Sequence, residues 1–190
     1  MRMSYFGDSY DFVKQGLLRC LTYLGPWSVH PMFTESVTGA ESSALQSFLG
    51  ARIISTAVLE PGIDRSLYFE DTSLCDHLFL DPNTGVSMKE VRGKKAPHYL
   101  FISDLLRLAK QRSDHLTMVF DQSLGHGAAR NALGEKLNCL RNEGISGFAY
   151  VSHACFMIVS PNESLVDEAR SAMLNNCRLP ETRFVSPTTA

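Results

Sequence analysis

Two short stretches of this chain contain carboxylates that could bind a substrate or take part in catalysis. Near the start, Asp8, Asp11 and Lys14 lie close together in the sequence, and farther along Asp81 and Pro82 follow an apolar run. A carboxylate can accept a hydrogen bond from a substrate amine or bind a hard cation, and a lysine can stabilise charge on a phosphate. Asp8, Asp11, Lys14 and Asp81 are therefore the candidate catalytic residues, for amine recognition or for metal-assisted phosphate chemistry.

The stretch around Asp81 has the pattern of a buried strand followed by a ligand-binding loop. Residues 77–80 are largely apolar, Pro82 lacks the N–H that a strand would use, and Gly85 permits a tight turn. In open α/β sheets, ligands bind in the crevice outside the carboxyl ends of the strands. We therefore expect Asp81 at the edge of a site, with Pro82 and Asn83 as substrate-binding residues. The alternative is a plain turn in which Asp81 caps loop amides.

Two further polar segments are candidates for contact with a substrate. Asp121 follows a second apolar run, at 116–120, and precedes a Gly-His-Gly sequence at 125–127, so a ligand-facing loop is expected there. The segment 87–97 is basic, and Lys94 and Lys95 within it could contact phosphates. The respective alternatives, a plain loop and a solvated basic loop, stay open.

Helices and strands alternate along the chain and would position these residues. Residues 9–24 carry apolar side chains at helical spacing, with Ser9 as the expected N-cap and with Asp11 and Lys14 on one face. Further helices are expected at 38–49, 99–110, 128–143 and 164–174, and strands at 27–33, 51–59, 77–80, 116–120, 147–152, 155–160 and 183–185. Residues 63–74 fit neither pattern.

This alternation predicts a single α/β domain over residues 1–185, followed by a frayed tail at 186–190. The expected architecture is a three-layer, Rossmann-like arrangement with a mostly parallel sheet. The segments 147–152 and 155–160 are separated by only two residues, which predicts an antiparallel hairpin near the C-terminus.

Composition is that of an ordinary globular protein, with 44% hydrophobic residues, 20% charged residues and a net charge of −2. No apolar run approaches the roughly 18 residues that span a bilayer, and the first residues lack the apolar core of a secretory leader. A cytoplasmic protein without membrane contact is therefore expected. The five cysteines show no CxxC spacing, so neither a zinc site nor a disulfide framework is expected, and most should be small buried residues.

A resemblance to a known family rests on two segments of the chain, YFGDSYDFVKQGLLR at 5–19 and FLDPNTGV at 79–86. They are similar to a YFGDxxDFxKxxLLR opening and an FxDPDNGL segment that occur in the same order in a family of bacterial proteins. That family distantly resembles the ribosomal RNA adenine-N6 methyltransferases, whose sequences open on GNxxDxxKH and whose DPPY motif lies at a strand end. The resemblance implies a methyltransferase-like fold, S-adenosylmethionine as the cofactor and nucleic acid as the partner.

The resemblance carries over to four residues. Asp81 and Pro82 match the first half of DPPY, in which the Asp-Pro unit holds the target amine, and Asp11 and Lys14 match the opening motif. Two features depart from the pattern. The sequence Asn-Thr replaces the second proline and the aromatic residue that stacks on the base, and residues 30–35 contain no glycine where a cofactor-binding turn would need one.

The leading hypothesis is a nucleic-acid-modifying enzyme related to S-adenosylmethionine-dependent methyltransferases, in which Asp81 holds the target amine. A Mg²⁺-dependent nuclease would instead use Asp8, Asp11 and Asp81 as metal ligands, with Lys14 stabilising phosphate charge. A third hypothesis is a non-catalytic binding module on a degenerate methyltransferase scaffold, which the missing glycine turn favours. The sequence gives neither the substrate nor the oligomeric state.

Overall fold

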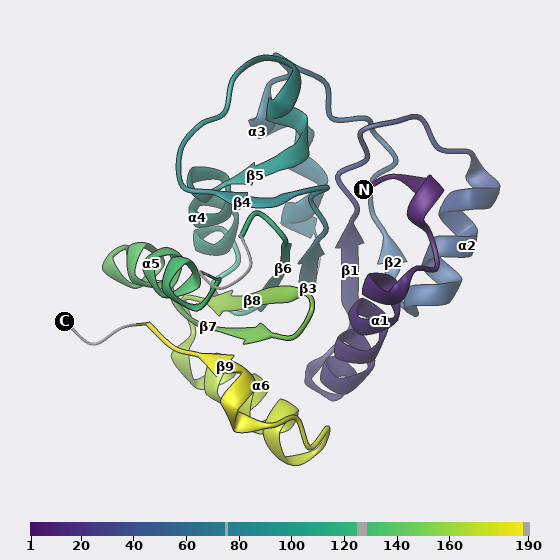
Figure 1. The fold of residues 1–190 in the computed structure, drawn as a ribbon. Helices are drawn as coiled ribbons and strands as arrows, with labels where there is room; N and C mark the ends of the chain where they lie inside the picture. Colours follow the sequence, from purple (N-terminus) through teal and green to yellow (C-terminus); the bar gives the residue numbers. More distant parts are fainter. Residues whose placement is uncertain (75, 125–128, 188–190) are drawn as a thin grey trace.

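The structure, a computed structural model, describes residues 1–74, 76–124 and 129–187 of the chain (Figure 1). The helices are α1 (Ser9–Leu21), α2 (Gly39–Leu49), α3 (Arg65–Tyr68), α4 (Ile102–Lys110), α5 (Ala129–Asn142) and α6 (Glu163–Asn175). The strands are β1 (Trp27–His30), β2 (Arg52–Ile53), β3 (His77–Leu80), β4 (Gly85–Ser87), β5 (Tyr99–Phe101), β6 (Thr117–Asp121), β7 (Ser146–Val151), β8 (Cys155–Ser160) and β9 (Phe184–Val185). Short 3-10 turns are η1 (Met3–Tyr5), η2 (Thr22–Leu24), η3 (Glu70–Leu74), η4 (Gly93–His98) and η5 (Glu181–Arg183).

The main sheet has the strand order β2-β1-β3-β6-β8-β7-β9. Strands β2, β1, β3 and β6 are parallel neighbours, β8 pairs antiparallel with both β6 and β7, and β9 pairs antiparallel with β7. Most strands therefore run in one direction. Strands β4 and β5 form a separate parallel pair. The predicted α/β class, with a mostly parallel sheet flanked by helices, is confirmed.

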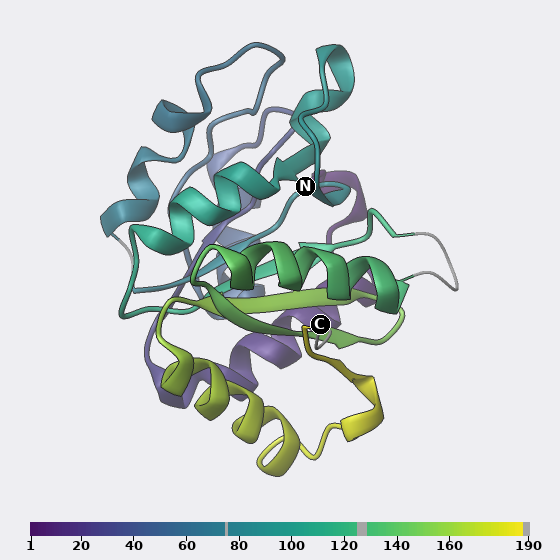
Figure 2. The ribbon, with the colours of Figure 1, turned by 90° about the vertical axis from the view of Figure 1, so that its left-hand side faces the viewer.

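Helices cover both faces of the main sheet. Side chains of α1, α2 and α6 pack in one core, and side chains of α3, α4 and α5 pack in the other. Figure 2 shows α5 and α6 on opposite sides of β7 and β8. Along β3, Phe79 lies in the first core, whereas Leu78 and Leu80 lie in the second. A strand buried on both faces needs apolar side chains at nearly every position, which explains the continuous apolar run that the sequence shows at β3.

Several element boundaries differ from those predicted. The helix expected over 99–110 begins only at Ile102, because the three residues before it pair with β4 as strand β5. The strand expected over 51–59 is reduced to β2, because only Arg52 and Ile53 pair with the neighbouring strand β1 at this edge of the sheet. The strand expected over 27–33 ends at His30, and residues 63–74 contain α3 and η3.

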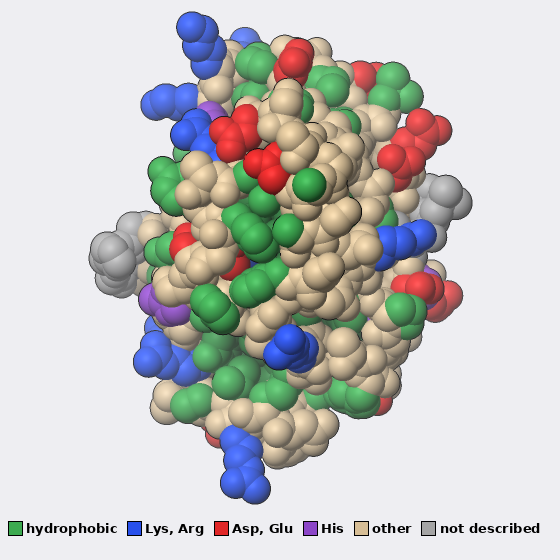
Figure 3. All heavy atoms as spheres, turned by 90° about the vertical axis from the view of Figure 1, so that its right-hand side faces the viewer, with side chains coloured by type: hydrophobic (Ala, Val, Ile, Leu, Met, Phe, Trp, Pro, Cys, Tyr) green, Lys and Arg blue, Asp and Glu red, His purple; other side chains and the backbone are tan. Residues whose placement is uncertain are grey.

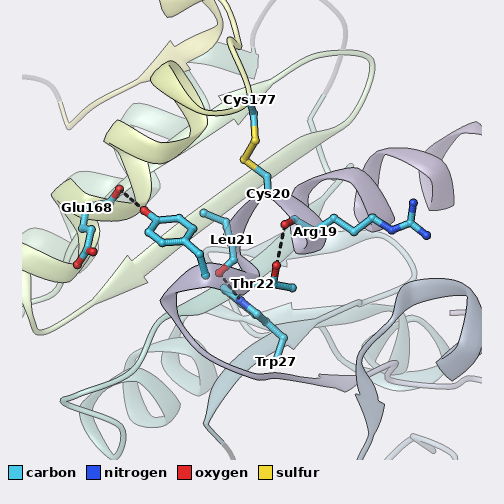
Figure 4. Close-up of a disulfide and its surroundings, with 8 residues drawn as sticks. Arg19, Cys20, Leu21, Thr22, Trp27, Glu168 and Cys177 are labelled. Carbon is cyan, nitrogen blue, oxygen red and sulfur yellow. Dashed lines mark hydrogen bonds between the residues drawn. A yellow bond between two sulfur atoms is a disulfide. The ribbon is translucent and has the colours of Figure 1, made fainter.

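Cys20 and Cys177 form a disulfide, which corrects the expectation of no disulfide framework (Figure 4). The two residues are 157 positions apart in sequence, yet their Cα atoms lie 6.1 Å apart because α1 packs beside α6. Sequence spacing carries no sign of such a pairing. Cys139 and Cys155 are free, half-buried and buried respectively, and Cys75 lies outside the described residues.

Within the described part of the chain, no helix is long and apolar enough to cross a membrane. The Gly-His-Gly sequence at 125–127, the expected helix start at Ala128 and the last three residues of the expected tail lie outside the described residues.

Candidate functional site

The order of the central strands reverses between β1 and β3. From β1 the chain passes to β2 on one side, and it then returns to place β3 on the other side of β1. In open α/β sheets, a ligand crevice forms outside the carboxyl ends of the strands at such a reversal. Asp81 directly follows β3, and His30 ends β1 opposite Leu80. Asp81 therefore lies at the edge of the sheet where a ligand crevice is expected.

The Asp81 side chain meets Lys14 of α1. Lys14 Nζ lies 2.8 Å from Asp81 Oδ2 and 2.9 Å from Asp11 Oδ1. All three side chains are buried. The structure thus brings three of the predicted catalytic residues into one ion network, which we call the Lys14 triad (Asp11, Lys14 and Asp81).

Charges in the Lys14 triad stabilise one another. Burial alone would lower the pKa of the Lys14 ammonium, but the two carboxylates outweigh it and the pKa is raised above its usual value. Burial raises the pKa of the Asp81 carboxyl, and the Lys14 ammonium offsets part of that rise. The triad joins two carboxyl groups to a single ammonium group. It is therefore suited to a ligand that donates hydrogen bonds.

Asp8 begins helix α1 and holds Asp11 in place. Asp8 Oδ1 accepts the N–H groups of Tyr10 at 2.9 Å and Asp11 at 3.1 Å, so Asp8 is the N-cap in place of the expected Ser9. Gly7, with a φ of +84°, donates its N–H to Asp11 Oδ2 at 2.9 Å. A positive φ of this size favours glycine, which accounts for the Gly-Asp pair at the start of the motif.

A pocket of about 190 Å³ opens at the Lys14 triad. Asp8, Pro82 and Asn83 also line it. Among the described residues, Asp81 Oδ1 has no hydrogen-bond partner, since Lys14 contacts only Oδ2. The pocket therefore offers a carboxylate oxygen that is free to accept a hydrogen bond from a ligand. Gln122, from the loop expected to face a ligand after the second apolar run, also lines the pocket, whereas sequence reasoning did not single out the further lining residues Met1, Arg2, Tyr5, Tyr10 and Phe120.

Aromatic side chains form part of the pocket wall. Lys14 Nζ lies 4.6 Å from the centroid of the Phe120 ring. The Tyr10 ring packs edge to face on Phe120 at 5.8 Å and lies 5.0 Å from the ring of His153. The sequence contained a signal for both aromatic residues, because Tyr10 lies inside the opening motif and Phe120 ends the apolar run before Asp121.

The first residues of the chain cover the end of β1. The Met1 amine donates hydrogen bonds to the carbonyl oxygens of Pro31 at 3.1 Å and Met32 at 2.8 Å, and burial lowers the pKa of this amine to about 5. Met32 and Phe33 are fully buried. The N-terminal amine of Met1 therefore already binds two carbonyl oxygens of the turn that follows β1.

Asp121 ends the neighbouring strand β6, but its side chain lies away from the pocket. Lys136 Nζ, from α5, lies 2.6 Å from Asp121 Oδ2. Asp121 Oδ1 accepts hydrogen bonds from the Val86 N–H at 3.1 Å and from Ser123 Oγ at 2.7 Å. The structure therefore does not bring Asp121 to the Lys14 triad, and its contacts hold strand β4 against the main sheet. The next residue, Gln122, lines the pocket instead.

One end of the basic segment reaches the pocket residue Asn83. Lys94 and Lys95 are exposed in η4, and His98 ends the same turn. The Asn83 amide nitrogen Nδ2 lies 2.8 Å from His98 Nδ1. Burial, and then the positive charge of Arg2, lower the pKa of His98. Segment η4 therefore ends next to the pocket residue Asn83, and Figure 3 shows Lys, Arg and His side chains along one edge of the molecule, with Asp and Glu side chains among them.

Comparison with protein-family models, with curated proteins and with solved structures found no match to this chain. The functional conclusion therefore depends on the geometry of the site.

Proposed function

We propose that this chain is a nucleic-acid-modifying protein related to S-adenosylmethionine-dependent methyltransferases, with the pocket at Asp81 as its base-binding site. The observation that supports this proposal is the Asp81 carboxylate, which presents a free acceptor oxygen in a pocket with aromatic walls at the strand reversal. Adenine, cytosine and guanine carry exocyclic amines on flat rings. Such a base would donate its amine hydrogen to Asp81 Oδ1 while its ring lies against aromatic side chains.

The surroundings of the pocket support nucleic acid as the partner. Enzymes that act on a base take it out of the stack and into a pocket, so the flanking phosphates stay outside. Arg2 lines the pocket, and the exposed Lys94 and Lys95 belong to the segment whose end, His98, contacts Asn83; these cations would contact such phosphates. Positive side chains beside a base-sized pocket suit a single strand better than a free nucleoside.

S-adenosylmethionine, the cofactor that the resemblance implies, does not fit the turn after β1. In doubly wound folds a nucleotide cofactor lies against a glycine-rich turn at this position. Here residues 31–38 contain no glycine, Met32 and Phe33 are buried, and Met1 occupies two carbonyl oxygens of the turn. No step of the proposal is therefore assigned to this cofactor. The same observation favours a second function, a non-catalytic nucleic-acid-binding module on a methyltransferase-like scaffold.

A Mg²⁺-dependent nuclease would need Asp8, Asp11 and Asp81 to face one cation. Asp8 instead caps α1, and the Lys14 ammonium lies between the other two carboxylates. In residues 1–74, 76–124 and 129–187, no group of three His, Cys, Asp or Glu side chains is placed to hold a metal ion. The contacts of these carboxylates thus support the first two functions more directly than the nuclease.

Binding of a fluorescein-labelled 12-nucleotide single strand, measured by anisotropy at several salt concentrations, tests the proposal. A protein that neutralises Z phosphates of a single strand loses affinity with a logarithmic salt slope of about −0.7Z. The double variant Lys94→Ala/Lys95→Ala should therefore bind more weakly, with a slope shallower by about 1.4. Lys110→Ala, which removes an exposed lysine of α4 that is paired with Glu143, is the matched control. Equal slopes for the two variants would contradict the proposal.

Thermal shifts with S-adenosylmethionine and with Mg²⁺ separate the enzyme from its alternatives. A ligand at 100 times its Kd stabilises the folded state by about 2.7 kcal/mol. A saturable shift with S-adenosylmethionine would support a methyltransferase, and a shift with Mg²⁺ alone would support the nuclease. Nucleic-acid binding without either shift would support the binding module. Asp81→Asn should then abolish any modifying activity while the protein stays folded.

A further inference from the structure

The strand-end motif of the pocket lacks the aromatic residue that would stack on a base. Asn83 and Thr84 stand after Pro82, and both are engaged elsewhere. The Asn83 amide contacts His98 Nδ1, the Thr84 N–H donates to the His98 carbonyl oxygen at 2.8 Å, and the Thr84 carbonyl oxygen accepts the N–H of Gln122 at 2.9 Å. A ring bound at Asp81 therefore needs its stacking partner from another part of the chain.

Tyr10 provides a flat aromatic surface that is held by one backbone hydrogen bond and by two neighbouring rings. Its backbone N–H is held by the Asp8 cap at the first turn of α1. Its ring packs edge to face on Phe120 at 5.8 Å and lies beside the exposed His153 ring at 5.0 Å. Tyr10 is half-buried and lines the same pocket as the Lys14 triad. Its ring is thus held in place before a ligand arrives.

Tyr5 is the second aromatic residue of the pocket that the ligand would cover. It ends η1, lines the pocket and is 62% exposed. A large aromatic side chain gains free energy when a flat ligand buries it, and stacking on a base tolerates any base because each has a π-face. The neighbouring Phe6 packs on Phe48 of α2 with the ring centroids 5.5 Å apart, which anchors the segment that presents Tyr5.

We infer that Tyr10 and Tyr5 form the ring-binding surface of this site and that they replace the aromatic residue missing after Pro82. The inference rests on the proposed function, because it takes the occupant of the pocket to be a nucleobase. Asp81 Oδ1 would accept from the exocyclic amine at one edge of the base, while the rings of Tyr10 and Tyr5 pack against the base. Bases that carry an amine should therefore bind better than uracil, which has carbonyl oxygens at the corresponding positions.

Isothermal titration of the full chain with adenosine, cytidine, guanosine and uridine tests the inference. The variants are Tyr10→Leu, which removes the ring but keeps apolar volume, Tyr10→Phe, which keeps the ring, and Tyr5→Leu. The control is Tyr23→Leu, at an exposed tyrosine of η2 whose hydroxyl donates to the Glu168 carbonyl oxygen (Figure 4). Each loss of base stacking should weaken binding roughly 5- to 150-fold, which corresponds to about 1–3 kcal/mol.

The inference predicts that Tyr10→Leu and Tyr5→Leu weaken binding of the amine-bearing nucleosides, that Tyr10→Phe restores it, and that Tyr23→Leu leaves it unchanged. It would be overturned by wild-type affinity in Tyr10→Leu, by equal losses in Tyr10→Phe and Tyr10→Leu, or by the absence of any nucleoside binding. Circular dichroism of each variant confirms its fold, and the exposed Tyr5 gives a test that does not depend on Tyr10 packing.

The oligonucleotide assay separates this inference from the proposed function. Strand binding that depends on Lys94 and Lys95 but not on Tyr10 would overturn the inference and leave nucleic acid as the partner. Nucleoside binding that depends on Tyr10, without any binding of the labelled strand, would support the ring-binding surface and contradict the nucleic-acid function.

Discussion

Removal of the disulfide between Cys20 and Cys177 should destabilise the chain mainly through its unfolded state. The bond joins residues 157 positions apart, so it restricts a very long loop when the chain unfolds. In the chain-entropy model, closing a loop of n residues changes the entropy of the unfolded chain by about −2.1 − 1.5R ln n cal/mol/K. For a loop of this length, the corresponding free energy is about 5 kcal/mol at 25 °C. Measured disulfides more often contribute about 2–4 kcal/mol. We therefore expect a loss of about 2–5 kcal/mol.

The perturbation is the double variant Cys20→Ser/Cys177→Ser, compared with the wild type by urea unfolding and by thermal melting. For a chain of this size, 1 kcal/mol corresponds to roughly 2–4 °C in Tm, so Tm should fall by roughly 4–20 °C. Reductant should bring the wild type to the level of the variant and leave the variant unchanged. Cys139→Ser, at a free half-buried cysteine, is the matched control and should show neither effect.

Equal stabilities of the wild type and the double variant would refute this reasoning. A tryptic digest made without reductant gives an independent check, because Arg19 precedes Cys20 and Arg178 follows Cys177. The digest should contain a linked pair of peptides that reductant separates. If only the two unlinked peptides were found, the cysteines would not be paired in the folded protein.

Three further substitutions and one change of pH test the structure. Lys14→Met leaves both partner carboxylates buried without a counter-charge and should cost about 3–5 kcal/mol in urea unfolding; a cost near zero would contradict the ion network. In Gly85→Ala the added Cβ would lie 2.1 Å from an Asp121 oxygen at a φ of +128°, so the variant should lose more than about 1 kcal/mol. By contrast Gly16→Ala, with nothing within 4 Å inside α1, should gain about 1 kcal/mol. Burial lowers the pKa of His30 to about 4, so from pH 6.5 down to 4 the unfolded chain binds more protons and stability should fall by up to about 1.4 kcal/mol per pH unit from this group. A pKa near 6.5 for His30 in an NMR titration of the folded protein would contradict this.

Those parts of the site that depend on a local sequence pattern could be predicted from the sequence. Asp11 and Lys14 are three residues apart on a helix, which places them on one face, and the apolar run before Asp81 marks the end of a buried strand. The sequence could not show that Lys14 also reaches Asp81, because that contact joins residues 67 positions apart. Such a contact depends on how α1 packs on the sheet.

The sequence also could not predict to which face of the sheet the side chain at each strand end would point. Asp81 and Asp121 both follow apolar runs, and the same pattern suggested that both face one site. In the structure Asp81 meets Lys14 of α1, whereas Asp121 meets Lys136 of α5 on the other side of the sheet. Side chains alternate between the two faces of a strand, and only the packing of the helices decides which face receives which residue.

The disulfide gives the chain an uneven response to mechanical force. Tension applied on either side of the cross-link passes through the S–S bond, so the segment between Cys20 and Cys177 carries none of the load. That segment would span on the order of 500 Å if fully extended, a length that stretching cannot release while the bond is intact. The first half of α1, with Asp11 and Lys14, lies outside the cross-linked loop. A pulling force would therefore separate Asp11 and Lys14 from Asp81, and β9 from β7, while the strands between the two cysteines stay folded.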